Sequence, residues 1–364
     1  MKSARQGLLM VTAALVAFGV VMVYSSSAIY AQETYGDTAY FFKRHLLYLC
    51  IGLAGSWWVL TLDPQRIRRS AKPFMLVTLL LLAAVLVPGL GHKVSGARRW
   101  FRLGWVSFQP AELAQLAVIL YLADMLTRKR GLLQDFFQGV LPALTVLGVT
   151  VGLVLLEPDL GTSVATAVVA ILMLFFAQVR WRYLVPLFGL AVPAVVALIL
   201  MKPYRMRRIV AYLNPWADPE GSGFQLIQSL VALGSGGLFG VGLGESRQKL
   251  FYLPAAHTDF IFSVIGEELG FVGATATLIL LGLLCWYGIR LALSAPDDFG
   301  MLTGLGIVFL LALETLVHVG VATGAIPTKG LPLPFISYGG SALIMNLVSI
   351  GVLLNVARPP KAVG

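Results

Sequence analysis

Residues 7–29 read GLLMVTAALVAFGVVMVYSSSAI, an uncharged and mostly apolar run near the N-terminus. A helix of about 20 apolar residues is long enough to span the hydrocarbon core of a bilayer, so this run predicts a membrane-spanning helix. It is long for the core of a secretory signal peptide, and no small-x-small cleavage site followed by a soluble domain accompanies it. We therefore expect it to be retained as the first of several spans.

The rest of the chain repeats this pattern. Of the 364 residues, 58% are hydrophobic and only 12% are charged, far from the average soluble protein. The sequence therefore predicts an all-α polytopic membrane protein of about ten transmembrane helices, which form a single integral membrane domain over residues 1–364. The predicted spans lie near residues 7–29, 46–62, 74–90, 113–126, 139–156, 161–178, 184–201, 261–289, 301–319 and 341–356.

The basic residues between the runs predict the orientation of the chain. With the N-terminus in the cytoplasm, 14 Lys and Arg residues fall on the inner side and 13 on the outer side. Ten of the outer ones lie in two longer segments, 91–112 and 202–260. The positive-inside rule largely ignores such segments, because it counts short loops beside the spans. We therefore expect both termini in the cytoplasm and residues 202–260 as a large extracytoplasmic loop between spans 7 and 8.

The net charge and the cysteines exclude some classes of partner and site. The net charge of +10 indicates anionic partners, such as phospholipid head groups or a pyrophosphate-linked lipid, and nucleic acid is not expected in so apolar a chain. Cys50 and Cys285 both fall inside apolar runs without a metal-binding spacing. We expect them to be small buried hydrophobes, with no disulfide and no metal.

Asp259 is the first candidate for chemistry. It closes segment 202–260 at the start of the eighth apolar run. A carboxylate is costly in lipid and useful where it lines a wet cavity that faces a lipid-borne substrate. The segment is too long for a plain connector, and its aromatic residues argue against disorder. Its Gly240-x-Gly242-x-Gly244 pattern has no Walker lysine after it and predicts a turning loop, not a nucleotide site.

Segment 202–260 also carries a basic group. Arg205, Arg207 and Arg208 follow its start, and Lys249 lies nearer its end. An interfacial helix that touches anionic lipid would explain the arginines. A clamp for pyrophosphate is the sharper alternative, because Arg donates two parallel hydrogen bonds to phosphate oxygens. We include all four residues among the candidates for substrate binding.

Segment 91–112 offers further candidates on the predicted outer side. Arg98 and Arg99 stand beside a tryptophan at the end of a span, which is typical of an interfacial anchor but would also suit a substrate contact. Glu112 lies at the mouth of the fourth span. It is either an acid in the first turn of a helix or a group that faces the outer cavity.

A very short turn between the fifth and sixth runs contains two acids, Glu157 and Asp159. Carboxylates pressed between apolar helices are expensive to keep there without a role. Asp159 could cap the following helix, pair with an arginine of the outer loops, or bind a hard divalent cation through oxygen. The sequence leaves these three alternatives open.

Four more polar residues lie inside apolar runs. Glu267 and Glu268 follow Asp259 in the eighth run, where they are either functional or bonded to a broken helix or a nearby basic group. Glu314 and His318 share a helix face in the ninth run. Two metal ligands without a third are weak evidence, so a paired and buried polar couple is favoured over a metal site.

The chain resembles the FtsW/RodA family, the SEDS (shape, elongation, division and sporulation) proteins of bacterial cell-wall synthesis. The resemblance extends from Met22 in the first span to the last helix. Within it, Pro327-Thr328-Lys329-Gly330 resembles the division (FtsW) branch more than the elongation branch. Five motifs in order carry the resemblance: Ala97-Arg98-Arg99-Trp100 with Gln109-Pro110-Ala111-Glu112, Glu157-Pro158-Asp159-Leu160-Gly161-Thr162, Asn214-Pro215-Trp216, Ala256-His257-Thr258-Asp259-Phe260 and Ser337-Tyr338-Gly339-Gly340-Ser341.

This resemblance implies a peptidoglycan glycosyltransferase that polymerises lipid II on the outer face of the bacterial cytoplasmic (inner) membrane. It implies a class B penicillin-binding protein as partner, other division or elongation complex proteins, and a divalent cation, Mg or Mn. The family's essential loop aspartate falls on Asp259 and its short-turn acid on Asp159. Lys329, in the division-branch motif, joins the substrate-binding candidates.

The sequence departs from the family pattern at two positions. Gln115 stands where many members carry Lys, so a substrate contact there would be weaker or supplied by Arg102 or Lys93. Ala255 stands where Glu is usual, which suggests that this Glu is dispensable.

These residues support one mechanism and leave two rival functions. We expect Asp259 to act as a general base, with inversion at the sugar carbon and undecaprenyl pyrophosphate as the leaving group. A lipid II flippase would instead use a central polar path through the buried acids and His318. A scaffold without chemistry would only recruit the penicillin-binding protein. The clustering of arginines and acids on the outer side favours the enzyme.

Overall fold

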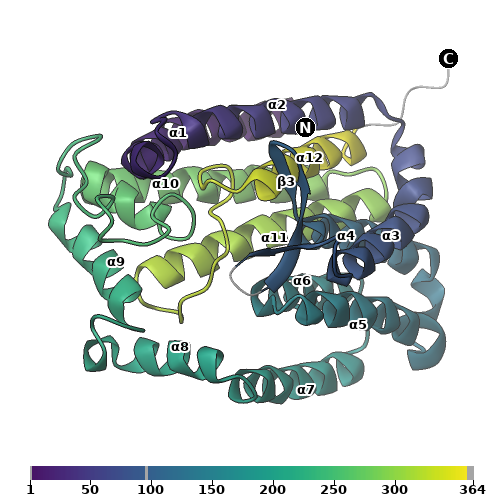
Figure 1. The fold of residues 1–364 in the computed structure, drawn as a ribbon. Helices are drawn as coiled ribbons and strands as arrows, with labels where there is room; N and C mark the ends of the chain where they lie inside the picture. The colour runs from purple at the N-terminus through teal and green to yellow at the C-terminus, as the bar shows by residue number, and fades with distance from the viewer. Residues whose placement is uncertain (1, 95–96, 359–364) are drawn as a thin grey trace.

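The computed structural model describes residues 2–94 and 97–358 and shows a bundle of helices (Figure 1). Lys361, one of the basic residues expected on the inner side, lies outside the described residues. Each of the ten predicted runs overlaps one long helix. These helices are α1 (Lys2–Tyr35), α2 (Tyr40–Thr61), α3 (Pro64–Leu86), α4 (Pro110–Arg128), α5 (Leu141–Leu156), α6 (Leu160–Phe176), α7 (Trp181–Leu200), α10 (Ile261–Leu293), α11 (Asp298–Ala322) and α12 (Gly340–Val356).

Seven helical segments in the described chain are long and apolar enough to cross a membrane. They are α1, α3, α4, α5 with the short η2 helix (Phe136–Val140) before it, α7, α10 and α11. A 3-10 turn, η1 (Arg130–Leu132), lies between α4 and η2. Helices α6 and α12 are apolar but shorter, and α2 carries Lys43 and Arg44. The helical class is confirmed, whereas the count of ten spans stays a prediction.

Burial separates the centre of the bundle from its edge. In α4, 83% of the most apolar window is buried inside the protein, whereas in α7 only 6% is. Small residues allow the inner helices to approach closely, as is common in membrane proteins. A Cβ added to Gly306 of α11 would lie 2.8 Å from Ile119 of α4, and one added to Gly351 of α12 would lie 2.6 Å from Ser56 of α2.

The structure adds one element that was not predicted and corrects one prediction. Residues 92–108 form a small three-stranded antiparallel sheet of β1 (His92–Val94), β2 (Ala97–Leu103) and β3 (Val106–Phe108) beside the helices. Gly104, with a φ of 62°, lies in the tight turn that joins β2 to β3, where a positive φ is favoured. Cys50 is exposed on α2 instead of buried, because the buried face of the helix runs through Tyr48 and Gly52 and Cys50 lies on the opposite side.

Segment 202–260 is structured. It contains α8 (Pro203–Leu213), the η3 turn (Pro215–Ala217) and α9 (Phe224–Ser235). The Gly240–Gly244 stretch turns as predicted, with φ values of 83°, 113° and 87° at its three alternate glycines. This loop docks onto α10 where Gly270, with a φ of 67°, breaks the helix. Backbone N–H groups of Val241 and Gly242 donate to the carbonyls of Glu267 and Glu268 at 3.0 Å each.

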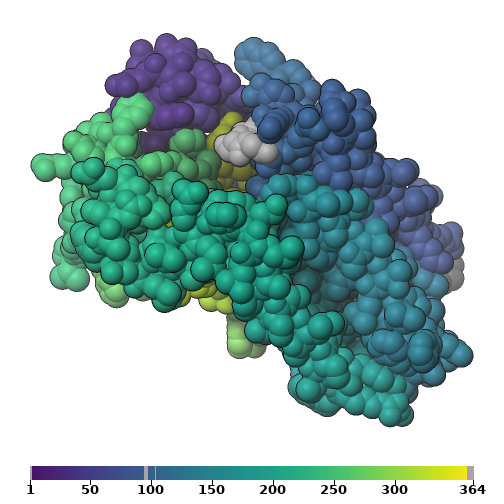
Figure 2. Space-filling view, turned by 60° about the horizontal axis from the view of Figure 1, so that its bottom comes forward, coloured from purple at the N-terminus to yellow at the C-terminus, as the bar shows by residue number. Residues whose placement is uncertain are grey.

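Helices α7 and α8 lie beside the bundle instead of inside it (Figure 1). In the space-filling view of Figure 2, the teal and green segments of α7 to α9 cover much of this face, and only small parts of the yellow C-terminal segment show between them. The two helices therefore form an outer wall over the loops that lead into α10 and α12.

Candidate active site

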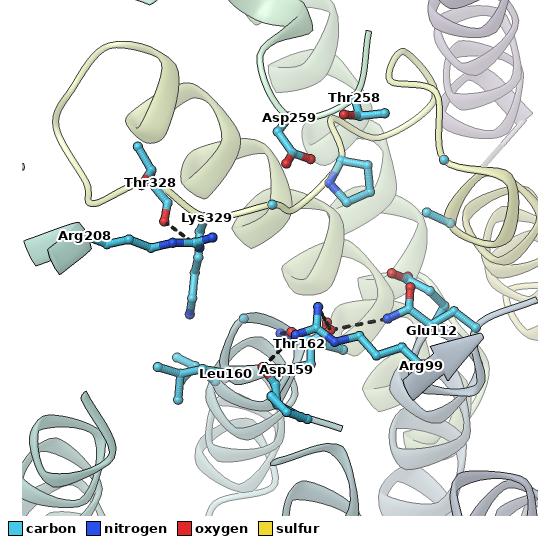
Figure 3. A pocket seen from close by; sticks show the side chains of 18 of the residues that line it. Arg99, Glu112, Asp159, Leu160, Thr162, Arg208, Thr258, Asp259, Thr328 and Lys329 are labelled. Carbon is cyan, nitrogen blue, oxygen red and sulfur yellow. Dashed lines mark hydrogen bonds and ion pairs between the residues drawn. The ribbon is translucent and has the colours of Figure 1, made fainter. Parts of the chain in front are cut away.

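A cavity of about 820 Å³ lies between α7 and α8 on one side and the ends of α4, α6, α10 and α12 on the other. In Figure 3 the Asp259 carboxylate points into the space above Asp159, Thr162 and Arg99. The Lys329 side chain enters the same space next to Arg208. The cavity brings together seven of the ten residues that the sequence nominated for catalysis or substrate binding: Asp259, Arg99, Glu112, Asp159, Arg205, Arg208 and Lys329.

The other three nominated residues do not line this cavity. Arg98 is partly buried on β2, and Arg207 is exposed on α8. Lys249 is buried, and its Nζ lies 2.9 Å from Oε1 of Glu268. The Ser25 hydroxyl of α1 donates to the same carboxylate at 2.7 Å. The structure therefore places Lys249 in a buried ion pair and not at the cavity where it was expected to bind substrate.

Asp259 lies on the loop that immediately precedes α10. Its backbone N–H donates to the carbonyl of Ala255 at 3.0 Å, in a turn where Ala255 has a φ of 58°. Burial raises the pKa of the Asp259 carboxyl, although the charge of Arg208 and the hydroxyl of Thr258 oppose the shift. A raised pKa makes this carboxylate a stronger base than an ordinary aspartate.

Asp159 is both a helix cap and a wall of the cavity. Its Oδ1 accepts from the backbone N–H of Thr162 at 3.1 Å, and its Oδ2 accepts from the Thr162 hydroxyl at 3.0 Å. Gln109 donates to Oδ2 from 3.3 Å, and Nη1 of Arg99 lies 3.9 Å away. Two of the three alternatives for Asp159, the cap and the arginine pair, are therefore present together.

Arg99 also holds the turn that carries Asp159. It donates from Nε to the Glu157 carbonyl at 2.8 Å and from Nη2 to the Pro158 carbonyl at 2.7 Å. The Glu157 side chain is buried, and desolvation together with the nearby charge of Asp159 raises its pKa to about 8. A carboxyl with that pKa is mostly neutral at pH 7, which reduces the cost of burying it.

The cavity has more basic than acidic side chains. Five basic residues line it against three acids, so it favours an anionic ligand. Arg205 is buried and donates to the Leu198 carbonyl at 2.7 Å, whereas Arg208 is exposed and donates to the Thr328 carbonyl at 3.3 Å. Burial lowers the pKa of Lys329 to about 8, although Asp159 opposes the shift. Lys329 therefore titrates near physiological pH.

The donor set does not form a dedicated metal site. Within residues 2–94 and 97–358, no group of three or more His, Cys, Asp or Glu side chains is arranged to hold an ion. Both oxygens of Asp159 already accept hydrogen bonds. Mg²⁺ is commonly held by one or two carboxylates together with substrate phosphates. A divalent cation at this cavity would therefore need phosphate oxygens of a bound substrate among its ligands.

Sequence reasoning missed residues that hold the site together. Thr162 follows Asp159 at the spacing of a helix cap, and this signal was available in the sequence. Gly330 was quoted only as the end of the division-branch motif, yet a Cβ added to it would lie 2.8 Å from Oδ2 of Asp259. Ser337 gave none beyond its place in a family motif, although its hydroxyl donates to the Thr258 carbonyl at 2.7 Å.

The buried acids of α10 bond to the loop beside them, whereas the expected couple of Glu314 and His318 on α11 is not formed: Oε2 of Glu314 and Nε2 of His318 have no hydrogen-bond partner among the described residues. Glu267 accepts from the Ser246 hydroxyl and from the Arg247 N–H, which fits the expected bond beside a broken helix. His318 places Nδ1 2.8 Å from the Leu331 carbonyl. Because a carbonyl only accepts, Nδ1 carries the proton and Nε2 is free of one in the neutral ring. Neither Glu314 nor His318 lines the cavity.

Comparison with known proteins gives consistent relatives over nearly the whole chain. Residues 5–362 match the FtsW/RodA/SpoVE family of cell cycle proteins. The chain is 46% identical over 354 residues to the probable peptidoglycan glycosyltransferase FtsW of Trichlorobacter lovleyi, which covers 97% of this chain and 93% of that protein. It is 44% identical over 351 residues to the stage V sporulation protein E of Bacillus subtilis, with 96% of each chain covered.

Two solved structures share the fold. A chain from a peptidoglycan synthase complex, described as coordinating polymerization and crosslinking, superposes with a TM-score of 0.80 at 38% identity and 97% coverage of both chains. The rod shape determining protein RodA of Thermus thermophilus superposes with a TM-score of 0.72 at 34% identity, covering 97% of this chain and 96% of that one. The similarity therefore covers nearly the whole chain, including the segments that carry the residues lining the cavity.

Proposed function

The chain belongs to the FtsW/RodA/SpoVE family of cell cycle proteins, and from this premise we propose that it is a peptidoglycan glycosyltransferase that polymerises lipid II. The observation that supports this most strongly is the cavity, where Asp259 and five basic side chains face one space. Lipid II carries a pyrophosphate, two sugars and a long lipid. A basic cavity beside a lipid-facing helix matches all three parts.

The basic residues would bind the pyrophosphate. Arg99 and Lys329 lie on either side of Asp159, and Arg208 closes the cavity from α8. Neutralising the pyrophosphate charge makes it a better leaving group, so the protein needs preorganised cations more than a strong acid. Val195 and Ile199 of α7 contribute to the apolar part of the wall, which suits the start of the lipid chain.

Asp259 would act as the general base. It accepts the proton of the acceptor 4-hydroxyl on GlcNAc while that oxygen attacks C1 of the donor MurNAc. The C1–O bond to undecaprenyl pyrophosphate breaks with inversion, and a β-1,4 link forms. General base catalysis contributes roughly 10²–10⁴-fold. The raised pKa of Asp259 supports this role, because a base works best when its pKa approaches the working pH.

A divalent cation, Mg or Mn, would assist by neutralising the same pyrophosphate oxygens. Of the two cavity carboxylates that are not proposed as the base, Asp159 already accepts hydrogen bonds within its turn, so Glu112 is the residue we would test as a ligand. In this scheme the protein residues orient the substrate whether the cation is bound by a protein carboxylate or by the substrate phosphates alone.

The partner we propose is a class B penicillin-binding protein, with other division or elongation complex proteins around it. A structural relative belongs to a complex that joins polymerization with crosslinking, and crosslinking is the chemistry of a transpeptidase. With both termini in the cytoplasm, the cavity would open on the outer face of the bacterial cytoplasmic membrane. There it would meet lipid II presented from the outer leaflet.

The test uses the purified protein with its penicillin-binding protein in proteoliposomes, with lipid II supplied only to the outer leaflet. We expect glycan polymer from the native protein and none from Asp259→Asn, which should fold and bind substrate normally. Translocation of lipid II without polymer would support a flippase, and neither product would support a scaffold. Full polymer yield from Asp259→Asn would refute the assignment of the base.

A further inference from the structure

Two loops meet at the Asp259 carboxylate. Thr258 and Asp259 lie before α10, and Lys329 and Gly330 lie between α11 and α12. A Cβ added to Gly330 would lie 2.8 Å from Oδ2 of Asp259, so the second loop passes directly against the carboxylate. In the part of the chain that the structure describes, no basic side chain comes within 4 Å of that carboxylate. No ion pair therefore holds it in place, and the position of these two loops limits where it can lie.

Ser337 joins these two loops through one hydroxyl group. Its Oγ donates to the Thr258 carbonyl at 2.7 Å and accepts from the Leu333 N–H at 2.8 Å. The side chain is only 3% exposed, so water does not replace either bond. Beside it, the Tyr338 N–H donates to the His257 carbonyl at 2.9 Å. The residue before Asp259 is thus tied to the loop that carries Gly330.

The loop that carries Ser337 is itself fixed. Phe335 has a φ of 65°, a conformation that is costly for a bulky side chain and that persists only where the surroundings determine it. Its side chain is 1% exposed. Its carbonyl presses on α1, where a Cβ added to Gly19 would lie 2.2 Å from that oxygen. Ser337 therefore transmits a rigid position to the Asp259 loop.

We propose that Ser337 is a positioning residue, which sets the direction of the Asp259 carboxylate toward the cavity. The inference rests on the proposed function, in which Asp259 is the base. Ser337 itself does not line the cavity, so its loss should change the chemical step and leave substrate binding nearly intact. A displacement of about 1 Å at a reacting group can cost about 10²-fold in rate.

The experiment compares Ser337→Ala with a matched variant elsewhere. Asn355 is fully buried and donates two 2.8 Å hydrogen bonds to the carbonyls of Val59 and Leu62, so Asn355→Leu also removes two buried bonds, but at the opposite end of α12. We expect both variants to lower the thermal midpoint. Only Ser337→Ala should lower kcat for lipid II polymerisation, by about 10- to 100-fold, with KM changed less than about threefold.

Ser337→Thr keeps the hydroxyl and should recover kcat relative to Ser337→Ala. If Ser337→Ala does not fold, Ser337→Cys keeps the size, weakens both bonds and takes its place in the comparison. A native kcat in the alanine variant, or an equal loss of kcat in Asn355→Leu, would overturn the proposal. An inactive Asp259→Asn beside a fully active Ser337→Ala overturns the positioning role alone. An active Asp259→Asn overturns the base on which that role rests, and the absence of polymer from the native protein overturns the proposed function itself.

Discussion

Gly330→Ala should disable the site while the fold survives. The added Cβ would lie 2.8 Å from Oδ2 of Asp259 and 3.2 Å from its Cγ, whereas ordinary van der Waals contact begins at 3.4 Å. The carboxylate or the loop must therefore move by about 0.6 Å. Because a misplacement of about 1 Å can cost about 10²-fold, we expect polymerisation of lipid II to fall by roughly 10- to 100-fold.

The assay is the initial rate of glycan polymerisation by the purified protein with its penicillin-binding protein. Gly234→Ala is the matched control, because it lies in α9 of the same chain and a Cβ there would meet nothing within 4 Å. We expect the control to keep its rate and both variants to keep their thermal midpoints within a few degrees. A Gly330→Ala rate above half that of the native protein would show that the carboxylate does not need its observed direction.

Two further predictions concern charge. The rate of polymerisation should rise with pH as Asp259 deprotonates, at a pH above the ordinary aspartate range because burial raises its pKa. The rate should fall again as Lys329 loses its proton near pH 8. Lys329→Arg should move only this alkaline limb of the pH–rate profile to higher pH, and an unmoved limb would exclude Lys329 as its source. Lys249→Met should destabilise the protein by about 3–5 kcal/mol, because it leaves the Glu268 carboxylate buried without its partner. The double variant Lys249→Met, Glu268→Met should recover most of that loss in thermal unfolding. No recovery would contradict the ion-pair account.

Local patterns predicted the helices well and the sheet poorly. An apolar run long enough to cross a bilayer is a property of neighbouring residues, so each predicted run overlaps a helix. In residues 92–108, tryptophan and arginine resembled an interfacial anchor. The alternation of apolar and polar residues that indicates a strand was too short to outweigh that interpretation. The turn at Gly104 was the signal that could have indicated a hairpin.

Site residues whose contacts are close in sequence could be predicted, whereas those whose contacts are distant in sequence could not. Asp159 caps the helix that begins at the next residue by accepting from the N–H of Thr162, three positions on, so this spacing was visible in the sequence. Lys249 was nominated from the basic group of segment 202–260 and Lys329 from the division-branch motif, and both were expected to bind substrate. What separates them is Glu268, which takes Lys249 into a buried pair across 19 positions. The bond from Ser337 to Thr258 spans 79 positions, and no local pattern predicts such a contact.

The buried acids are where the enzyme and transporter interpretations diverge. A flippase would need a polar path through the bundle that could open to a head group. In this structure Glu268 is bonded to Lys249 and Ser25, and Glu267 holds the loop at Ser246. Opening a path there would break a buried ion pair and detach the loop that leads to Asp259. The contacts that obstruct transport therefore also hold the loop of Asp259 in place at one end of the bundle. A fixed carboxylate is what polymerisation requires.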